Sequence, residues 1–319
     1  MSIQNWLWGI LLSIVINCCF AKNHVSDYQR IFLPVYAPSG ELNIAIRVFE
    51  MNSIPSFLIV DPASLETRIL PIHTLYSRGT PQKKQSGYSA HWNIASTRYY
   101  QLLRKSTAAP YLSVNQGIIH ADKVSSGNVL SIDLCPSTQP FEADFFNKLV
   151  DLANKNKQPV PITIAISGMW MLEHPNEFQW LRRQAQAKKL SITWANHSFS
   201  HVYYNDLPDS ENFMMTPSTN MDAELLLTEK YLLEENELPS VFFRFPGLAS
   251  NKTLVKQLRQ YGLIPLGTDA WLADMPKRHK NITAGGILLV HGNSNEHQGI
   301  VMLTPLLSAL QLLDIKSVI

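Results

Sequence analysis

Side chains able to do acid–base, metal or anion chemistry follow five apolar runs in the second part of this 319-residue chain. In chain order, these groups fall at residues 133–136, 196–201, 244–247, 268–271 and 291–292. His197 and His201 have the i, i+4 spacing with which two imidazoles can hold one divalent metal ion. Asp133 and His291 could exchange protons with a substrate, and Arg244 could hold an anion. Five such groups in succession indicate one site that is built from many strand ends.

Each of these signals has a plainer interpretation when it is taken alone. A single Asp after a strand is more often a turn or cap residue. His291 could be a satisfied histidine of the core, Arg244 could lie on the surface of a turn, and the histidine pair could arise by chance. The order and placement of all five groups favour a functional site over these alternatives.

Hydrophobic periodicity from residue 128 onward predicts strands that alternate with helices. Strands are expected at residues 128–134, 161–167, 191–195, 241–245, 264–268 and 287–291, and helices at 143–155, 176–188, 221–235, 252–261 and 303–313. Repeated strand–helix units predict an α/β fold with a parallel sheet or barrel. The chemistry of such folds sits at the carboxyl ends of the strands, where the five groups are found.

The preceding segment, residues 22–122, has a different pattern. Its short apolar runs at 31–33, 44–49, 57–60 and 68–72 are broken by prolines, which predicts a smaller strand-rich N-terminal module. Residues 79–87 are expected to form an exposed loop, and residues 96–105 a single helix. The polar stretch 123–127 is a predicted linker to a catalytic domain at residues 128–319. The role of the N-terminal module is not indicated by its sequence.

The first 21 residues are typical of a secretory signal peptide. An apolar run at 6–20 ends in small residues, and cleavage is expected after Ala21. An uncleaved anchor helix is the alternative interpretation. After cleavage the chain would keep a single cysteine, Cys135, and could form no internal disulfide. We therefore expect an exported protein of the bacterial envelope, periplasmic or extracellular, with no stable membrane span after cleavage.

The composition excludes two classes of protein. The chain has 27 Lys and Arg against 25 Asp and Glu, a net charge of +2, and 45% hydrophobic residues. A nucleic-acid-binding protein needs a dense basic patch, which this near-neutral balance does not supply. The hydrophobic content is far above that of a disordered chain.

Residues 128–319 resemble the polysaccharide deacetylases of carbohydrate esterase family 4. The resemblance rests on five ordered motifs. They are Ser-Ile-Asp-Leu-Cys-Pro at 131–136 for the family's Thr-Phe-Asp-Asp-Gly-Pro, the two histidines at 197–201, Arg-Phe-Pro-Gly at 244–247, the pair Asp269 and Trp271, and Leu-Val-His at 289–291. The resemblance implies a distorted β/α barrel. It also implies a metal-dependent hydrolase that removes N-acetyl groups from a glycan, usually one built of N-acetylglucosamine.

The same resemblance assigns the site residues. Asp133 aligns with the base and His291 with the acid, while Arg244 would hold Asp133 and Asp269 would pair with His291. Trp271, Phe245 and Pro246 are the expected substrate contacts. The resemblance also implies a divalent metal, with zinc as the expected ion, on His197 and His201. Asp133 is the expected third ligand, as a replacement for a carboxylate that this chain lacks.

One departure from the family concerns the metal. The family's second Asp, a carboxylate ligand, is Leu134 here. Asp133 could swing to the metal, waters could complete the shell, or Cys135 could contribute a thiolate, although a small buried residue is the favoured interpretation of Cys135. The departure also keeps a second function class open, a non-catalytic glycan-binding descendant of the same fold.

Overall fold

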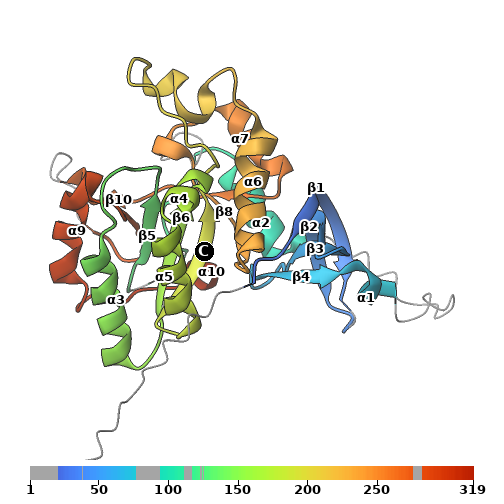
Figure 1. Ribbon diagram of the computed structural model, residues 1–319, viewed down its shortest axis with the longest axis horizontal. Helices are drawn as coiled ribbons and strands as arrows, with labels where there is room; N and C mark the ends of the chain where they lie inside the picture. The colour runs from blue at the N-terminus through green and yellow to red at the C-terminus, as the bar shows by residue number, and fades with distance from the viewer. Residues whose placement is uncertain are drawn as a thin grey trace, which may run out of the picture.

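The computed structural model describes residues 21–37, 39–76, 94–110, 117–122, 124, 126–275 and 282–319. Within these ranges the chain forms a large parallel sheet and a smaller antiparallel one (Figure 1). The predicted signal segment, apart from Ala21, and the predicted loop at 79–87 lie outside the described residues. None of the described helices is long and apolar enough to cross a lipid bilayer.

The parallel sheet has seven strands in the order β10-β11-β5-β6-β7-β8-β9. Their bounds are β5 (Val129–Leu134), β6 (Val160–Ile166), β7 (Leu190–Asn196), β8 (Pro239–Phe243), β9 (Ile264–Pro265), β10 (Ala270–Trp271) and β11 (Ile287–His291). The strands β5, β6 and β8 are largely apolar and mostly buried, because the helices and the N-terminal sheet together shield the parallel sheet from water. This curled sheet and its helices confirm the predicted distorted β/α barrel.

The helices of the barrel agree with the sequence pattern except for a short helix at residues 168–173, which the pattern did not predict, and except at the C-terminal end. They are α3 (Ala143–Asn156), α4 (Gly168–Glu173), α5 (Pro175–Gln186), α6 (Met221–Glu234), α7 (Lys252–Gln260), α9 (His297–Leu303) and α10 (Ile315–Val318). The predicted helix at 303–313 was wrong, since α9 ends where that helix was expected to begin. Pro305 lacks the N–H that would bond to the Val301 carbonyl, so the α-helical hydrogen bonding ends there and the chain continues as a short 3-10 turn at Thr304–Leu306.

A short segment before β5 joins the open side of the barrel. Ile118 bridges Leu266 after β9, and His120 bridges Gly286 before β11. The backbone N–H of Gly267 donates to the Ile118 carbonyl at 2.8 Å. Residues 117–121 therefore lie between the two ends of the sheet, although the sequence places them with the N-terminal module.

The N-terminal sheet is an antiparallel meander beside the barrel (Figure 1). It consists of β1 (Val25–Tyr36), β2 (Leu42–Met51), β3 (Ile54–Val60) and β4 (Thr67–Pro71), followed by α1 (Ile72–Tyr76) and α2 (Arg98–Ser106). Asn52 and Ser53 join β2 to β3 with φ angles of 50° and 64°, the left-handed backbone of a two-residue hairpin turn. The expected strand-rich module and the expected helix near residues 96–105 agree with this arrangement, whereas α1 was not predicted.

The two sheets share one hydrophobic cluster. From the N-terminal side it contains Ile44, Ile46 and Leu58, and from the barrel Val129 and Ile287. Val129 and Ile287 are the first residues of β5 and β11, at the opposite ends of those strands from Asp133 and His291. The N-terminal sheet thus packs on the barrel away from the predicted site.

A buried ion pair fastens the N-terminal sheet to the barrel. Arg47 of β2 donates from Nε and Nη2 to the two carboxylate oxygens of Glu229 of α6, at 2.6 and 2.7 Å. Tyr28 of β1 donates its hydroxyl to the same carboxylate at 2.9 Å. Both charged side chains are buried, so the loss of one would leave the other uncompensated.

We therefore expect Glu229→Gln to lower the free energy of unfolding by about 3–5 kcal/mol, measured by urea denaturation. Glu234→Gln on the same helix is the matched control. Glu234 pairs with Lys230 at 3.6 Å on the surface, and its replacement should cost less than about 1 kcal/mol. Equal losses in the two variants would contradict the role of the buried pair.

Candidate active site

The register of the parallel strands brings the predicted residues to one edge of the barrel. His291 at the end of β11 lies opposite Asp133 of β5. Asn196 at the end of β7 lies opposite Phe243 of β8, so the residues that follow, His197 and Arg244, leave their strands at the same level. The strand ends therefore converge as the sequence pattern predicted.

A cavity of about 700 Å³ opens at this edge. Of the residues singled out by sequence, it is lined by Asp133, Cys135, His197, His201, Trp271 and His291. Tyr203, Tyr204, Phe213 and Glu296 also line it, and the sequence did not point to them. The volume is within the usual range for a small-ligand site.

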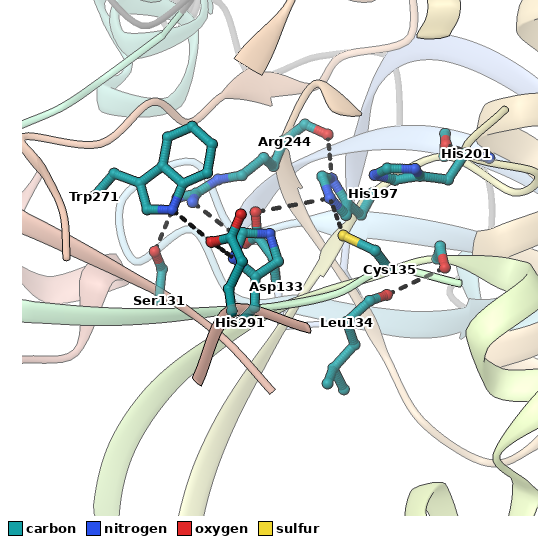
Figure 2. Close-up of polar contacts among 12 residues, drawn as sticks. Ser131, Asp133, Leu134, Cys135, His197, His201, Arg244, Trp271 and His291 are labelled. Carbon is teal, nitrogen blue, oxygen red and sulfur yellow. Dashed lines mark hydrogen bonds and ion pairs between the residues drawn. The ribbon is translucent and has the colours of Figure 1, made fainter. Parts of the chain in front are cut away.

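Asp133 is held in place by a buried arginine. Arg244 donates from Nη1 to Asp133 Oδ1 at 3.2 Å, and from Nη2 to Ser131 Oγ at 2.9 Å and the Gly267 carbonyl at 3.0 Å (Figure 2). The guanidinium is fixed at three points and is inaccessible to solvent. It therefore orients the carboxylate while leaving Oδ2 toward the cavity side, 3.7 Å from His197 Nε2. The expected pairing of Arg244 with Asp133 is present.

His197 is oriented by the backbone. Its Nδ1 lies 2.8 Å from the Arg244 carbonyl, which can only accept, so Nδ1 carries the proton and Nε2 presents a lone pair. Burial lowers the pKa of His197, which favours the neutral ring that a metal ligand requires. Nε2 lies 3.5 Å from Cys135 Sγ.

His201 stands beside His197 with its ring turned inward. Its φ angle is 47°, and its backbone N–H donates to Ser198 Oγ at 3.1 Å, which closes the tight turn after β7. The two imidazole centroids are 4.8 Å apart. The buried Nε2 of His201 has no hydrogen-bond partner among the described residues. A buried nitrogen left in this way is costly unless it binds a ligand.

These residues fit a divalent metal ion. Donor atoms of Cys135, His197 and His201 all lie within 4.8 Å of one another. Imidazole nitrogens and a cysteine sulfur are the donors that zinc prefers. Asp133, the third ligand expected from sequence, does not belong to this group of described residues.

Leu134 does not face the cavity. Its side chain is fully buried in the cluster between the sheet and the helices. A Cβ added to Gly292 would come within 2.5 Å of Leu134 Cδ2, so the two residues pack tightly. Successive side chains of a strand point to opposite faces, and Figure 2 shows Leu134 directed away from Asp133 and Cys135. A carboxylate placed at position 134 would enter the core and not the site.

Cys135 also differs from its favoured interpretation as a small core residue. It is a free, partly exposed thiol in the wall of the cavity. Burial alone would raise the pKa of this thiol, but His201 and His291 outweigh it and lower the pKa to about 7. Thiolate is therefore accessible near neutral pH.

His291 is supported by Glu296. Nδ1 of His291 lies 2.8 Å from Glu296 Oε2, and Trp271 donates its indole N–H to the same oxygen at 2.8 Å. Burial alone would lower the pKa of His291, but Cys135 and Glu296 outweigh it and raise the pKa well above its ordinary value. Burial likewise acts to raise the pKa of Glu296, but His291 and Trp271 reverse the effect and lower it. The pair favours a protonated imidazole in the cavity wall.

The expected partner of His291, Asp269, lies elsewhere. Ala270 is paired with Leu288, so Asp269 lies level with the start of β11, four residues before His291. At about 3.3 Å per residue this is roughly 13 Å along the strand. Asp269 instead accepts from Thr283 Oγ1 at 2.8 Å, and it is not among the described residues that line the cavity.

Phe245 and Pro246 are not placed to contact a substrate. Phe245 is 1% exposed and packs edge-on against Phe243 at 4.9 Å, and Pro246 is buried. The chain turns sharply after Phe245, with φ angles of 60° at Gly247 and 53° at Leu248, and these two residues line the cavity instead. Of the three expected substrate contacts, only Trp271 faces the cavity.

Comparison with known proteins gives two kinds of match. Residues 26–100, less than a quarter of the chain, match a family described as the RP012 protein N-terminal domain. The solved structures that are similar include a family 4 carbohydrate esterase from Bacillus anthracis (16% identity, 71% of this chain and 94% of that chain, TM-score 0.45). They also include the peptidoglycan deacetylase PdaC from Bacillus subtilis (16%, 60% and 90%, 0.40) and a pseudoenzyme of the same esterase family from Bacillus anthracis (16%, 62% and 67%, 0.43). These identities and scores carry no argument about activity, which must rest on the site itself.

Proposed function

We propose that this chain is an exported, metal-dependent polysaccharide deacetylase that removes N-acetyl groups from an N-acetylglucosamine-type sugar of a cell-wall or extracellular glycan. The observation that carries the proposal is the meeting of three groups in one cavity. They are the carboxylate of Asp133 held by Arg244, the imidazole of His291 held by Glu296, and the metal-ligating set around His197 and His201. The five ordered motifs of the sequence support the same reaction.

A divalent ion held by the histidines would polarise the amide carbonyl and acidify water beside it. The protein's own residues then divide the proton transfers. Asp133 takes a proton from the attacking water as that water bonds to the carbonyl carbon. His291 gives its proton to the sugar nitrogen as the carbon–nitrogen bond breaks, so the products are acetate and a free amine. Trp271 and Glu296 hold the His291 ring in position for this transfer.

A non-catalytic glycan-binding protein is the second candidate. The observation that favours it is Leu134, because the family's carboxylate ligand is missing there and the leucine faces the core. A site with two histidines alone would bind metal weakly. The two candidates differ in whether the purified protein carries metal and releases acetate.

Replacing both His197 and His201 with Ala tests the proposal. We expect the double variant to lose its metal, measured by elemental analysis, and to lose acetate release by about 10³-fold or more. His297→Ala is the control, because this histidine is 59% exposed and pairs with Glu142 outside the cavity. Full acetate release by the double variant would overturn the proposed role of the metal.

A further inference from the structure

We propose that Cys135 supplies the third protein ligand of the metal as a thiolate, in place of the carboxylate that position 134 lacks. The inference rests on the metal site of the proposed function but not on the reaction assigned to it. It concerns which donor completes the site, and it leaves Asp133 for proton transfer.

The spacing of the donors supports a shared ion. A sulfur and a nitrogen bound to one tetrahedral zinc lie about 3.6 Å apart, given zinc bonds of about 2.3 and 2.1 Å. Cys135 Sγ and His197 Nε2 are separated by 3.5 Å. His201 completes the group of donors within 4.8 Å of one another, and its buried Nε2 has no other partner among the described residues.

Asp133 is engaged elsewhere. Its Oδ1 accepts from Arg244, whose other amino group is itself fixed by Ser131 and Gly267. Its Oδ2 lies 3.7 Å from His197 Nε2, but Asp133 is not among the donors that lie within 4.8 Å of one another. The carboxylate would therefore have to shift to share an ion with both histidines, and a shift would weaken its contact with the buried guanidinium. Cys135 needs no such rearrangement, because its sulfur already lies beside His197.

The backbone at the end of β5 explains why a ligand can be supplied by position 135 and not by position 134. Leu134 closes β5 with its side chain in the helical layer, so the next side chain returns to the cavity face. The Leu134 carbonyl accepts a hydrogen bond from the Ser167 hydroxyl at 3.1 Å, which anchors the strand end before Cys135. A hydrophobic residue at 134 and a donor at 135 are therefore compatible at the same strand end.

A thiolate with two imidazoles has its own metal preference. Soft sulfur ligands favour zinc, whereas magnesium and manganese prefer oxygen. Three protein ligands leave an open position of the kind found in catalytic zinc sites. We therefore expect the site to bind zinc or cobalt, and we expect excess magnesium not to displace the bound ion.

Cobalt(II) titration of the full chain tests the inference without an activity assay. Cobalt in a thiolate site gives a sulfur-to-metal charge-transfer band in the near ultraviolet, besides the visible bands of its coordination geometry. We expect this band in the wild type and its loss in Cys135→Ser. We also expect the cobalt dissociation constant to rise at least about 10-fold in that variant, since even outer-shell partners are worth 10–100-fold.

Cys135→Asp is the matched variant, because it offers a carboxylate at the same position. It should bind cobalt without the charge-transfer band. Cys18 and Cys19 are present in all three proteins, so a band that persists in Cys135→Ser would assign the sulfur elsewhere and overturn the inference. Visible cobalt bands without charge transfer in the wild type would also overturn it while leaving a metal on the histidines. No cobalt binding at all would reject the metal site of the proposed function as well.

Discussion

Asp133→Asn should lower kcat for acetate release by about 10²–10⁴-fold, the usual worth of a general base. The amide cannot accept the proton of the attacking water, yet it keeps the size of the side chain and can still lie beside Arg244. The cavity shape and the substrate KM should change little. Steady-state kinetics on an N-acetylated oligosaccharide measures both parameters.

The metal content of the same variant separates two roles of Asp133. If Cys135 is the third ligand, Asp133→Asn should keep its zinc, and if Asp133 is a ligand the zinc should be lost. Asp269→Asn is the comparison, because Asp269 lies about four residues along the sheet from the cavity and should retain most of the wild-type kcat. An unchanged kcat in Asp133→Asn would contradict its role as the base.

His291→Ala should lower kcat by a similar factor of about 10²–10⁴, because the leaving amine then has no proton donor. The protonated imidazole is the active form, so activity should persist below the pKa of His291 and fall as the pH rises through it. Since the surroundings raise that pKa well above its ordinary value of about 6.5, the alkaline limb of the kcat profile should lie above this value.

Glu296→Gln tests the origin of this shift. Removing the carboxylate beside Nδ1 removes one cause of the raised pKa, so the alkaline limb should move to lower pH. Glu234→Gln, on the surface of α6, should leave the limb in place. A limb that does not move in Glu296→Gln would show that another group sets the protonation of His291.

The sequence was sufficient for the barrel and for the edge on which the site lies. A long alternation of apolar strands with amphipathic helices is compatible with few folds other than a parallel sheet or barrel. The carboxyl ends of parallel strands lie at the same edge of the sheet, whatever the conformation of the connecting loops. The convergence of Asp133, His197, Arg244 and His291 follows from that rule alone. No knowledge of loop conformation was needed for it.

The site contacts that the sequence predicted wrongly or did not predict all depend on strand register or on the conformation of turns. Asp269 was expected near His291 because the family resemblance implied that the two pair, but β10 is short and pairs with the start of β11. Glu296 reaches His291 only because residues 294–296 form a 3-10 turn, for which the sequence offered no signal. Gly247 and Leu248, which have positive φ angles, likewise lie in the cavity wall, whereas Phe245 stays in the core.

The position of the third donor in the cavity wall also depends on the direction of side chains at a strand end. An alignment compares positions in a line, whereas a strand sends neighbouring side chains to opposite faces. The motif comparison places the missing carboxylate at position 134, but the side chain that lies in the cavity wall is that of Cys135. The distance of 3.5 Å between Cys135 Sγ and His197 Nε2 shows which of the two positions can supply a metal ligand.

The central claim is most directly tested by supplying the zinc-loaded full chain with an oligomer of N-acetylglucosamine and measuring acetate and free amine together. We predict that the two products appear in equal amounts, that a chelator stops their release and that added zinc restores it. Binding of the oligomer, detected by calorimetry, without release of either product in the presence of zinc would contradict the account and identify the chain as a glycan-binding protein.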